Sequence, residues 1–321
     1  MSHDLYPTAR PEDFAVAPDA IRRTVHEIRQ VRHLELHSFL LLRKGVLLWE
    51  EYFREGEKNR LHVMHSVSKS FTSAAIGLAQ AEGLLSIEDK LYDFFPAHAG
   101  LCDSDYKREL TLRHLLMMGS GFENREEELF NADADPVKAA LSMPVLHKPG
   151  TVFDYYTFGT YLLSVVFSKV NPEGVHAYLR KKLFEPMGFG ASHWNVDDSC
   201  VPWGGFGLYL TAYDMTRLGQ LCLQNGAWGG QQLLPGAYIH DATAKQIGNF
   251  SEGRQDWSAG YGYQFWRNAM GGYRADGMHG QYIIVLPEQQ SVIVMTSHLQ
   301  DMQVPLAAIG THLLPAMNPS F

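Results

Sequence analysis

The stretch that decides the fold is His65-Ser-Val-Ser-Lys-Ser-Phe-Thr-Ser-Ala-Ala-Ile-Gly-Leu-Ala-Gln-Ala-Glu-Gly83. Small and apolar residues predominate after Lys69, and they predict a buried helix over Ser66–Gly83 that stops at Gly83. Ser66 and Lys69 are three residues apart, which is close to one helical turn, so we expect both side chains on the same face. The sequence therefore places a hydroxyl beside an amine at the start of a buried helix.

This Ser-x-x-Lys pair is suited to nucleophilic catalysis. A serine hydroxyl is a poor nucleophile until a neighbouring base takes its proton. A lysine acts as that base when burial lowers its pKa, since desolvation disfavours the charged form. Backbone N–H groups at a helix start also face a developing oxyanion. The sequence thus makes Ser66 the candidate nucleophile and Lys69 its candidate base.

A second match to the motif, Ser104-Asp-Tyr-Lys107, has a different setting. It lies in a polar, charged segment with no apolar helix after it. We therefore interpret Ser104 as a surface residue.

Strand patterns occur on both sides of the helical middle of the chain. Apolar runs within Ser38–Phe53 flank Lys44-Gly45, which is a hairpin signal, and a second hairpin is expected from Gln281–Leu286 and Val292–Ser297 around 287–290. Tyr261–Trp266 is interpreted as another strand nearby. Strands at both ends of the sequence predict one antiparallel sheet built from the two ends.

Helical spacing recurs between and after these strands. The expected helices are Thr111–Met118, Gly159–Lys169, His176–Phe184, Ala212–Asn225 and Pro305–Leu314. The predicted class is α+β. Because no internal repeat or low-complexity linker is found, we expect a single catalytic domain over residues 1–321. Its sheet-containing region would comprise about 1–90 and 200–321, with an all-helical region of about 91–200 inserted.

Composition excludes several classes of protein. The chain has 321 residues, of which 45% are hydrophobic and 19% charged, and a formal net charge of −8. Without a basic run, this charge argues against a nucleic-acid partner and a membrane-surface role. No signal peptide and no apolar run of membrane-spanning length is found, which predicts a cytoplasmic protein. The three cysteines, Cys102, Cys200 and Cys222, predict neither a disulfide framework nor a zinc cluster.

Six segments, taken together in chain order, carry a family resemblance. They are His65–Ser73, Glu82–Asp89, Thr111–Phe122, Pro149–Thr157, Leu183–Gly188 and Gly205–Asp214. This set resembles the class C β-lactamase-related proteins, which include family VIII carboxylesterases, D-amino-acid peptidases and aminohexanoate-oligomer hydrolases. The resemblance spans about residues 38–298. It implies a serine β-lactamase/transpeptidase-like fold, an antiparallel sheet flanked by helices, and an acyl-enzyme formed on Ser66.

The resemblance also implies a second catalytic position at Tyr155, within Phe153-Asp-Tyr-Tyr-Thr157. In this family the matching tyrosine exchanges a proton with the nucleophile and the leaving group. A phenol, with a pKa near 10 when free, serves as an acid or base only beside a cation such as Lys69. The alternative is that Tyr155 and Tyr156 are packing aromatics. Thr157 replaces the family's asparagine and is a candidate substrate-binding residue.

This chain differs from the family pattern at the third motif. β-Lactamases and penicillin-binding enzymes carry Lys-Thr-Gly on a late strand. After Lys182 the chain has only Lys245, in Ala-Lys-Gln, which does not fit. The matching region is Arg274-Ala-Asp-Gly-Met-His-Gly-Gln281.

Four residues of this region are candidate site residues. Gly277 would take the glycine position, and the backbone N–H of Met278 would complete the oxyanion hole. His279 is either a polar substitute for the missing lysine or a loop residue. Arg274 is a candidate cation for a substrate carboxylate.

Neither a cofactor nor a metal is predicted. The chain has no Gly-rich phosphate loop and no dinucleotide fingerprint. His33-x-x-x-His37 has ligand spacing, but no carboxylate-rich partner or His-Glu-x-x-His pattern accompanies it, so we interpret it as a solvated pair. A nucleophile elbow, Gly-x-Ser-x-Gly, is also missing, which disfavours the α/β-hydrolase fold.

The predicted function is a serine hydrolase, favoured as a carboxylesterase for small esters because no Lys-Thr-Gly lysine would hold a charged substrate. Hydrolysis of oligoamides or D-peptides and of β-lactams are the enzymatic alternatives. A non-catalytic scaffold that keeps the fold is the alternative from another class. The predicted partner is a small ester or amide molecule, and the sequence carries no signal for an oligomeric state.

Overall fold

The core of the protein is a six-stranded antiparallel sheet with the order β2-β1-β11-β10-β9-β8. In this computed structural model, the described residues are 6–30, 35–125, 135–252 and 255–317. The strands are β1 (Glu35–Arg43), β2 (Val46–Tyr52), β8 (Trp266–Arg267), β9 (Tyr273–Gly277), β10 (Gln281–Leu286) and β11 (Ser291–His298). The pairing of β1 with β11 confirms the predicted sheet from both ends of the sequence.

Both predicted hairpins are present. Lys44 and Gly45 have φ values of 53° and 75°, as a two-residue turn between twisted strands requires, and Arg43 pairs with Val46 across it. Strands β10 and β11 are joined by the turn at 287–290, where Gln290 has a φ of 48°. Local turn chemistry therefore sets the register of both hairpins.

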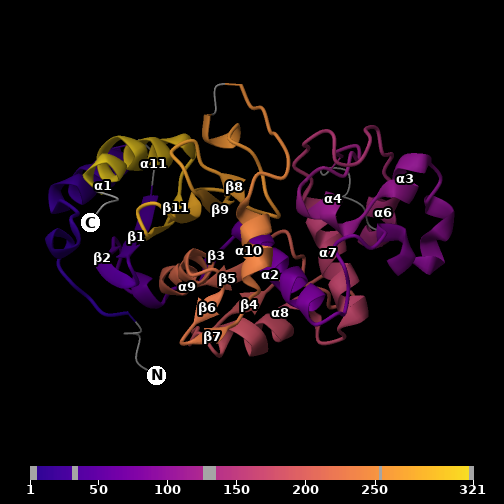
Figure 1. The fold of residues 1–321 in the computed structure, drawn as a ribbon, viewed down its shortest axis with the longest axis horizontal. Coiled ribbons are helices and arrows are strands. Elements are labelled where there is room, and N and C mark those ends of the chain that lie inside the picture. Colours follow the sequence, from indigo (N-terminus) through magenta and orange to yellow (C-terminus); the bar gives the residue numbers. More distant parts are fainter. Residues whose placement is uncertain (1–5, 31–34, 126–134, 253–254, 318–321) are drawn as a thin grey trace.

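Helices cover both faces of the sheet (Figure 1). On one face, α1 (Pro18–Gln30) lies beside α11 (Gln303–Ala308) over Phe39 and Ile293. On the other, α2 (Val67–Ala81) and α9 (Ala212–Leu223) contact the sheet. Side chains along each strand point in turn to the two faces of the sheet. Both faces are apolar because helices bury both of them.

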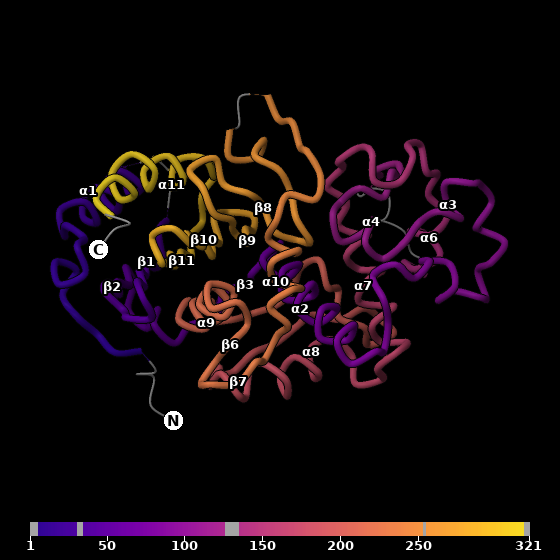
Figure 2. Tube along the Cα trace, viewed as in Figure 1, coloured from indigo at the N-terminus to yellow at the C-terminus, as the bar shows by residue number. Residues whose placement is uncertain are grey.

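A mostly helical region lies on the far side of α2 from α1 and α11 (Figures 1 and 2). Its helices are α3 (Asp105–Glu109), α4 (Leu112–Leu116), α6 (Pro136–Ser142), α7 (Thr157–Val170) and α8 (Gly174–Leu179). α7 packs on both α2 and α4. The α+β class is thus confirmed, and α2 lies between the sheet and the helical region.

The remaining elements are short. They are β3 (His62–Val63), β4 (His193–Trp194), β5 (Leu208–Leu210), β6 (Ala227–Trp228), β7 (Gln231–Gln232), α10 (Gly236–Thr243), and the helical turns η1 (Pro11–Phe14), η2 (Glu57–Asn59), η3 (Leu91–Phe94), η4 (Pro96–Leu101), η5 (Arg180–Phe184), η6 (Gln255–Trp257), η7 (Ile309–Leu313) and η8 (Leu314–Ala316). Strand β5 lies between β3 and β4 in a second sheet. Among the helices described, none is long and apolar enough to cross a membrane.

The predicted strand over Tyr261–Trp266 is wrong. Only Trp266 belongs to a strand, β8, while Tyr261 makes isolated bridges to Ile247 and Trp266. The reason is Gln264, whose φ of 67° interrupts an extended chain. Its side-chain amide donates to the backbone oxygens of Leu115 and Leu116, so a contact with α4 sets this conformation.

Candidate active site

The backbone fixes Ser66 at the N-terminus of α2. The short pairing of β3 with β5 continues in a hydrogen bond of 2.7 Å from the Met64 nitrogen to the Leu208 oxygen. His65 then adopts a φ of 46°, and helix α2 begins directly after Ser66. Ser66 therefore lies at the positive end of the helix dipole, where negative charge is stabilised.

Ser66 and Lys69 are in hydrogen-bond contact. The Lys69 Nζ lies 3.1 Å from the Ser66 Oγ, and the lysine is 1% exposed. Nζ also donates to the backbone oxygen of Gly205 at 2.9 Å and to the Thr157 Oγ1 at 3.2 Å. These contacts hold the nitrogen beside the serine hydroxyl, and in its neutral form the amine has a lone pair for the serine proton. The arrangement provides a hydroxyl with a buried amine able to take its proton.

Thr157 lies beside this pair, at the start of α7. It was predicted as a substrate-binding residue, but it is buried and its hydroxyl accepts from Lys69. In the structure it is therefore a partner of the lysine. Thr157 occupies the place of the family's asparagine while keeping an oxygen within reach of Nζ.

Tyr155 also contacts the lysine. Its ring centroid lies 4.8 Å from the Lys69 Nζ, and the ring stacks on Trp266 with centroids 5.4 Å apart. The Asn124 side chain donates to the backbone oxygen of Tyr155 at 3.0 Å. Tyr156, in contrast, is buried against Phe122. Of the two tyrosines, Tyr155 is the one that the structure brings to Lys69.

The end of β9 lies against the start of α2. A Cβ added at Gly277 would overlap the Met64 oxygen and would lie 3.2 Å from the Ser66 nitrogen. Only glycine permits this approach, and it brings the predicted third motif to the nucleophile. Met278 follows directly and is an exposed residue. Two backbone N–H groups, of Ser66 and Met278, thus flank the junction of β9 and α2.

His279 belongs to a group of three histidines at this junction. Its ring stacks on His298 with centroids 4.1 Å apart and meets His65 edge-on at 5.5 Å. The His279 Nδ1 lies 3.2 Å from the Leu299 oxygen, and its φ is 65°. Burial, followed by the two neighbouring imidazoles, lowers the pKa of His65 to about 4. His65 is therefore neutral near pH 7.

The prediction that Arg274 supplies a cation to substrate is wrong. Arg274 is 0% exposed, and its guanidinium donates to Asp276, to Asn268 and to the backbone oxygens of Asp256 and Arg267. It also lies over the ring of Trp257 at 4.8 Å. Arg274 is thus a buried structural ion-pair partner, which a substrate carboxylate does not reach.

Asp276 was not singled out from the sequence. Its carboxylate accepts from Arg274 at 2.9 Å and is buried. Burial raises the pKa of Asp276, while the charges of Arg274 and Lys69 oppose that shift. Asp276 stands immediately before Gly277. The presence of a carboxylate within this third motif was the sequence signal that could have pointed to it. The hydrogen bond from Lys69 to the backbone oxygen of Gly205 was also not predicted, because any residue type can supply a backbone acceptor.

The second Ser-x-x-Lys match does not form such a pair. Ser104 is a half-buried helix cap whose hydroxyl accepts from the Lys107 nitrogen at 3.3 Å, so it is less exposed than predicted. The Lys107 Nζ donates instead to the backbone oxygens of Leu101 and Leu141. The contrast supports Ser66 as the reactive serine.

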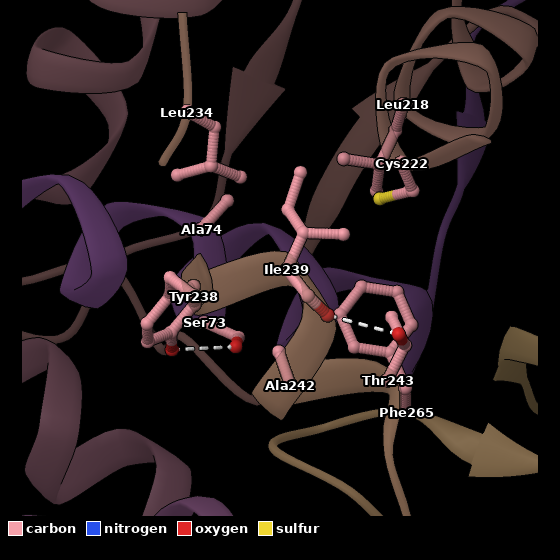
Figure 3. A pocket seen from close by; sticks show the side chains of 10 residues that line it. All are labelled: Ser73, Ala74, Leu218, Cys222, Leu234, Tyr238, Ile239, Ala242, Thr243 and Phe265. Carbon is pink, nitrogen blue, oxygen red and sulfur yellow. Dashed lines mark hydrogen bonds between the residues drawn. The ribbon is translucent and has the colours of Figure 1, made fainter. Parts of the chain in front are cut away.

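An enclosed cavity of about 10 Å³ lies behind α2 and is separate from this site (Figure 3). Its lining from α2, α9 and α10 is mainly apolar, with a hydrogen bond of 2.9 Å between Ser73 and Tyr238. It includes the Cys222 thiol, whose pKa burial raises to about 12. Such a volume holds about one water molecule, so it is a packing gap.

The fold and the paired Ser66 and Lys69 define the class of protein, a serine hydrolase. The model of the beta-lactamase family matches residues 21–313, and the chain belongs to that family. The 6-aminohexanoate-dimer hydrolase of Paenarthrobacter ureafaciens is 24% identical over 91% of this chain and 80% of its own length.

Two solved structures share the fold. A D-stereospecific amidohydrolase from Streptomyces sp. has a TM-score of 0.69 and 17% identity, covering 90% of this chain and 97% of its own. EstCE1, described as a hydrolase with promiscuous acyltransferase activity, has a TM-score of 0.73 and 15% identity, with coverages of 91% and 97%. These two structures show the same fold, and the family match supports an enzyme over a non-catalytic scaffold.

Proposed function

We propose that the protein is a carboxylesterase that hydrolyses small neutral esters through an acyl-enzyme on Ser66. The observation that carries the proposal is the 3.1 Å contact between the Ser66 Oγ and a buried Lys69 Nζ. Lys69 is held by Thr157 and Gly205, so its orientation costs little at the moment of reaction.

The reaction proceeds in two steps, acylation and deacylation of Ser66. In acylation, the Ser66 hydroxyl proton passes to the Lys69–Tyr155 pair, Oγ bonds to the ester carbon, and the alkoxide leaves with that proton. The N–H groups of Ser66 and Met278 stabilise the tetrahedral oxyanion. In deacylation, water gives a proton to the same pair while its oxygen bonds to the acyl carbon. The bond from that carbon to the Ser66 Oγ then breaks, Oγ takes the proton back from the pair, and the acid leaves.

The preference for neutral substrates follows from the third motif. Ala275, Asp276 and Gly277 stand where related enzymes have Lys-Thr-Gly, and Arg274 is buried in its own ion pair. A charge-assisted hydrogen bond contributes about 1.5–3 kcal/mol, which is roughly ten- to a hundredfold in binding. Its loss weakens binding of a β-lactam carboxylate and leaves a neutral ester unaffected.

A second candidate is hydrolysis of linear oligoamides. The specific observation that favours it is the 24% identity to a 6-aminohexanoate-dimer hydrolase over 91% of this chain. An amide has a poorer leaving group, so it makes a stronger demand on proton donation by the Lys69–Tyr155 pair. The same serine and lysine would serve either substrate.

The experiment compares kcat/KM for p-nitrophenyl butyrate, nitrocefin and the 6-aminohexanoate dimer on one preparation, with Ser66→Ala as the blank. We expect ester turnover well above the blank and nitrocefin turnover close to it. Efficient nitrocefin turnover would replace the esterase proposal by a β-lactamase one. Turnover of the dimer exceeding that of the ester would favour the oligoamide candidate, and failure of a fluorophosphonate to label Ser66 would reject both.

A further inference from the structure

Three ionisable side chains meet in a buried cluster outside the catalytic residues. His37 comes from β1, Glu57 from η2 and His62 from β3. One nitrogen or carboxylate oxygen from each lies within 4.8 Å of the other two. The two imidazoles stack with centroids 5.2 Å apart, and the His62 Nε2 is in contact with the Glu57 carboxylate. We call this set the His37 cluster.

The polar atoms of the His37 cluster are shielded from water, and few of them have a polar partner. Glu57 is 1% exposed and His62 is 8% exposed. Apart from the contact between the His62 Nε2 and the Glu57 carboxylate, the Glu57 oxygens, the His62 Nε2 and both ring nitrogens of His37 make no hydrogen bond to the described residues. The Arg60 guanidinium is 3.9 Å from the Glu57 carboxylate and largely exposed. A buried carboxylate in such surroundings costs several kcal/mol unless a cation compensates it.

Local backbone features direct these side chains toward one point. The β1–β11 register shifts between Leu36 and Ser38, so His37 is the extra residue of a β-bulge. A bulge re-aims the side chain that it carries. Gly56, with a φ of 74°, turns the chain directly before Glu57. Three separate segments are thus shaped to bring their donor atoms together.

We propose that His37, Glu57 and His62 bind one divalent transition-metal ion of the zinc type. Two imidazole nitrogens and a carboxylate oxygen are a donor set that zinc takes, with bonds of about 2.0–2.2 Å. The fourth position falls to water or to the Glu35 carboxylate, which lies 3.6 Å from the His37 Nε2. The carboxylate then gains the missing cation, and the imidazoles gain a partner for their buried nitrogens.

The protonation states agree with this proposal. Burial is the main reason that the pKa values of both imidazoles are lowered, and the pKa of His62 falls to about 4. Neutral imidazole is the form that binds metals.

The bound ion would stabilise the segment that leads to the nucleophile. His62 is four residues before Ser66, and strand β3 ends at Val63. An ion held by His62, His37 and Glu57 would join β1, η2 and β3 just before α2. Its role is therefore structural, which sets it apart from the hydrolytic reaction at Ser66.

The test is metal binding by the full chain after treatment with a chelator. Titration with Co²⁺ should give visible d–d absorption that saturates at one equivalent, and Zn²⁺ should displace the cobalt. Glu57→Gln and His62→Gln should each lose this absorption. His240→Gln is the matched control, because that histidine side chain is 81% exposed and far from the cluster in sequence, and it should bind as the unaltered chain does.

A second measurement covers variants that fold poorly. Zn²⁺ at about a hundred times its Kd should raise the Tm of the unaltered chain by about 4 °C, and the same Zn²⁺ should leave Glu57→Gln unshifted. Absence of a stoichiometric cobalt site in the unaltered chain would overturn the proposal, as would equal binding by Glu57→Gln. Fluorophosphonate labelling of Ser66 in the metal-free chain reports on the proposed hydrolysis separately.

Discussion

Replacement of Gly277 by alanine tests the junction between β9 and α2 directly. A Cβ at this position would overlap the Met64 backbone oxygen and would crowd the Ser66 nitrogen at 3.2 Å. Both neighbours are backbone atoms, so the strand end itself has to move, by a distance on the order of 1 Å. A misplacement of about 1 Å costs about 10²-fold in rate, and loss of one oxyanion-hole donor costs about 10²–10³-fold in kcat, or about 2.7–4 kcal/mol. We therefore expect kcat to fall at least a hundredfold in Gly277→Ala.

The assay is kcat for p-nitrophenyl butyrate, measured beside the midpoint of urea unfolding. Gly100→Ala is the matched control, because an added Cβ there meets nothing within 4 Å and the backbone does not have a positive φ. The control should keep kcat and gain slightly in stability, by about 0.4–1 kcal/mol. Retention of kcat within threefold in a folded Gly277→Ala would refute the assignment of this junction to the oxyanion hole.

Three further substitutions separate the roles assigned to individual side chains. Ser66→Ala should lower kcat by several powers of ten, whereas Ser104→Ala should lose only a helix cap, about 1 kcal/mol of stability; an acyl adduct on another serine by mass spectrometry would contradict this. Lys69→Arg should be nearly as inactive as Lys69→Ala, since a guanidinium keeps its proton at accessible pH, and more than a tenth of the original kcat/KM would show that the base lies elsewhere. Arg274→Gln should cost about 3–5 kcal/mol of unfolding free energy by leaving Asp276 buried without its partner; a changed KM with unchanged stability would instead return Arg274 to the substrate site.

Local sequence signals predicted much of the fold and the contact between Ser66 and Lys69. Lys44-Gly45 sets a two-residue turn by its own backbone preference, and the three-residue spacing of Ser66 and Lys69 was enough to predict their contact. Such features depend on residues close together in the chain. The helix start after His65 and the two hairpins were predictable for that reason.

The errors arise where distant segments decide a residue's surroundings. Gln264 breaks the predicted strand because its side chain is satisfied by α4, about 150 residues earlier. Arg274 looked available from its motif, but Asp256 and Trp257 enclose it.

His37 was paired in the sequence with His33, which lies outside the described residues. The structure instead places His37, mostly buried, beside Glu57 and His62, so the prediction of a solvated pair is wrong for His37. Its partners come about twenty residues later, which the local spacing could not reveal.

The pairing of β1 with β11 determines when this sheet can form during synthesis. Ser38 and Thr296 share a hydrogen bond of 2.6 Å across 258 positions of the chain. On the ribosome, β1 and β2 can form their hairpin early, but the inner edge of β1, with Phe39 and Leu41, stays without its partner until β11 has emerged. An unpaired apolar edge of this kind is prone to association with other chains. The nascent protein is thus expected to keep this edge of β1 unpaired until β11 has been synthesised, and to complete its central sheet only then.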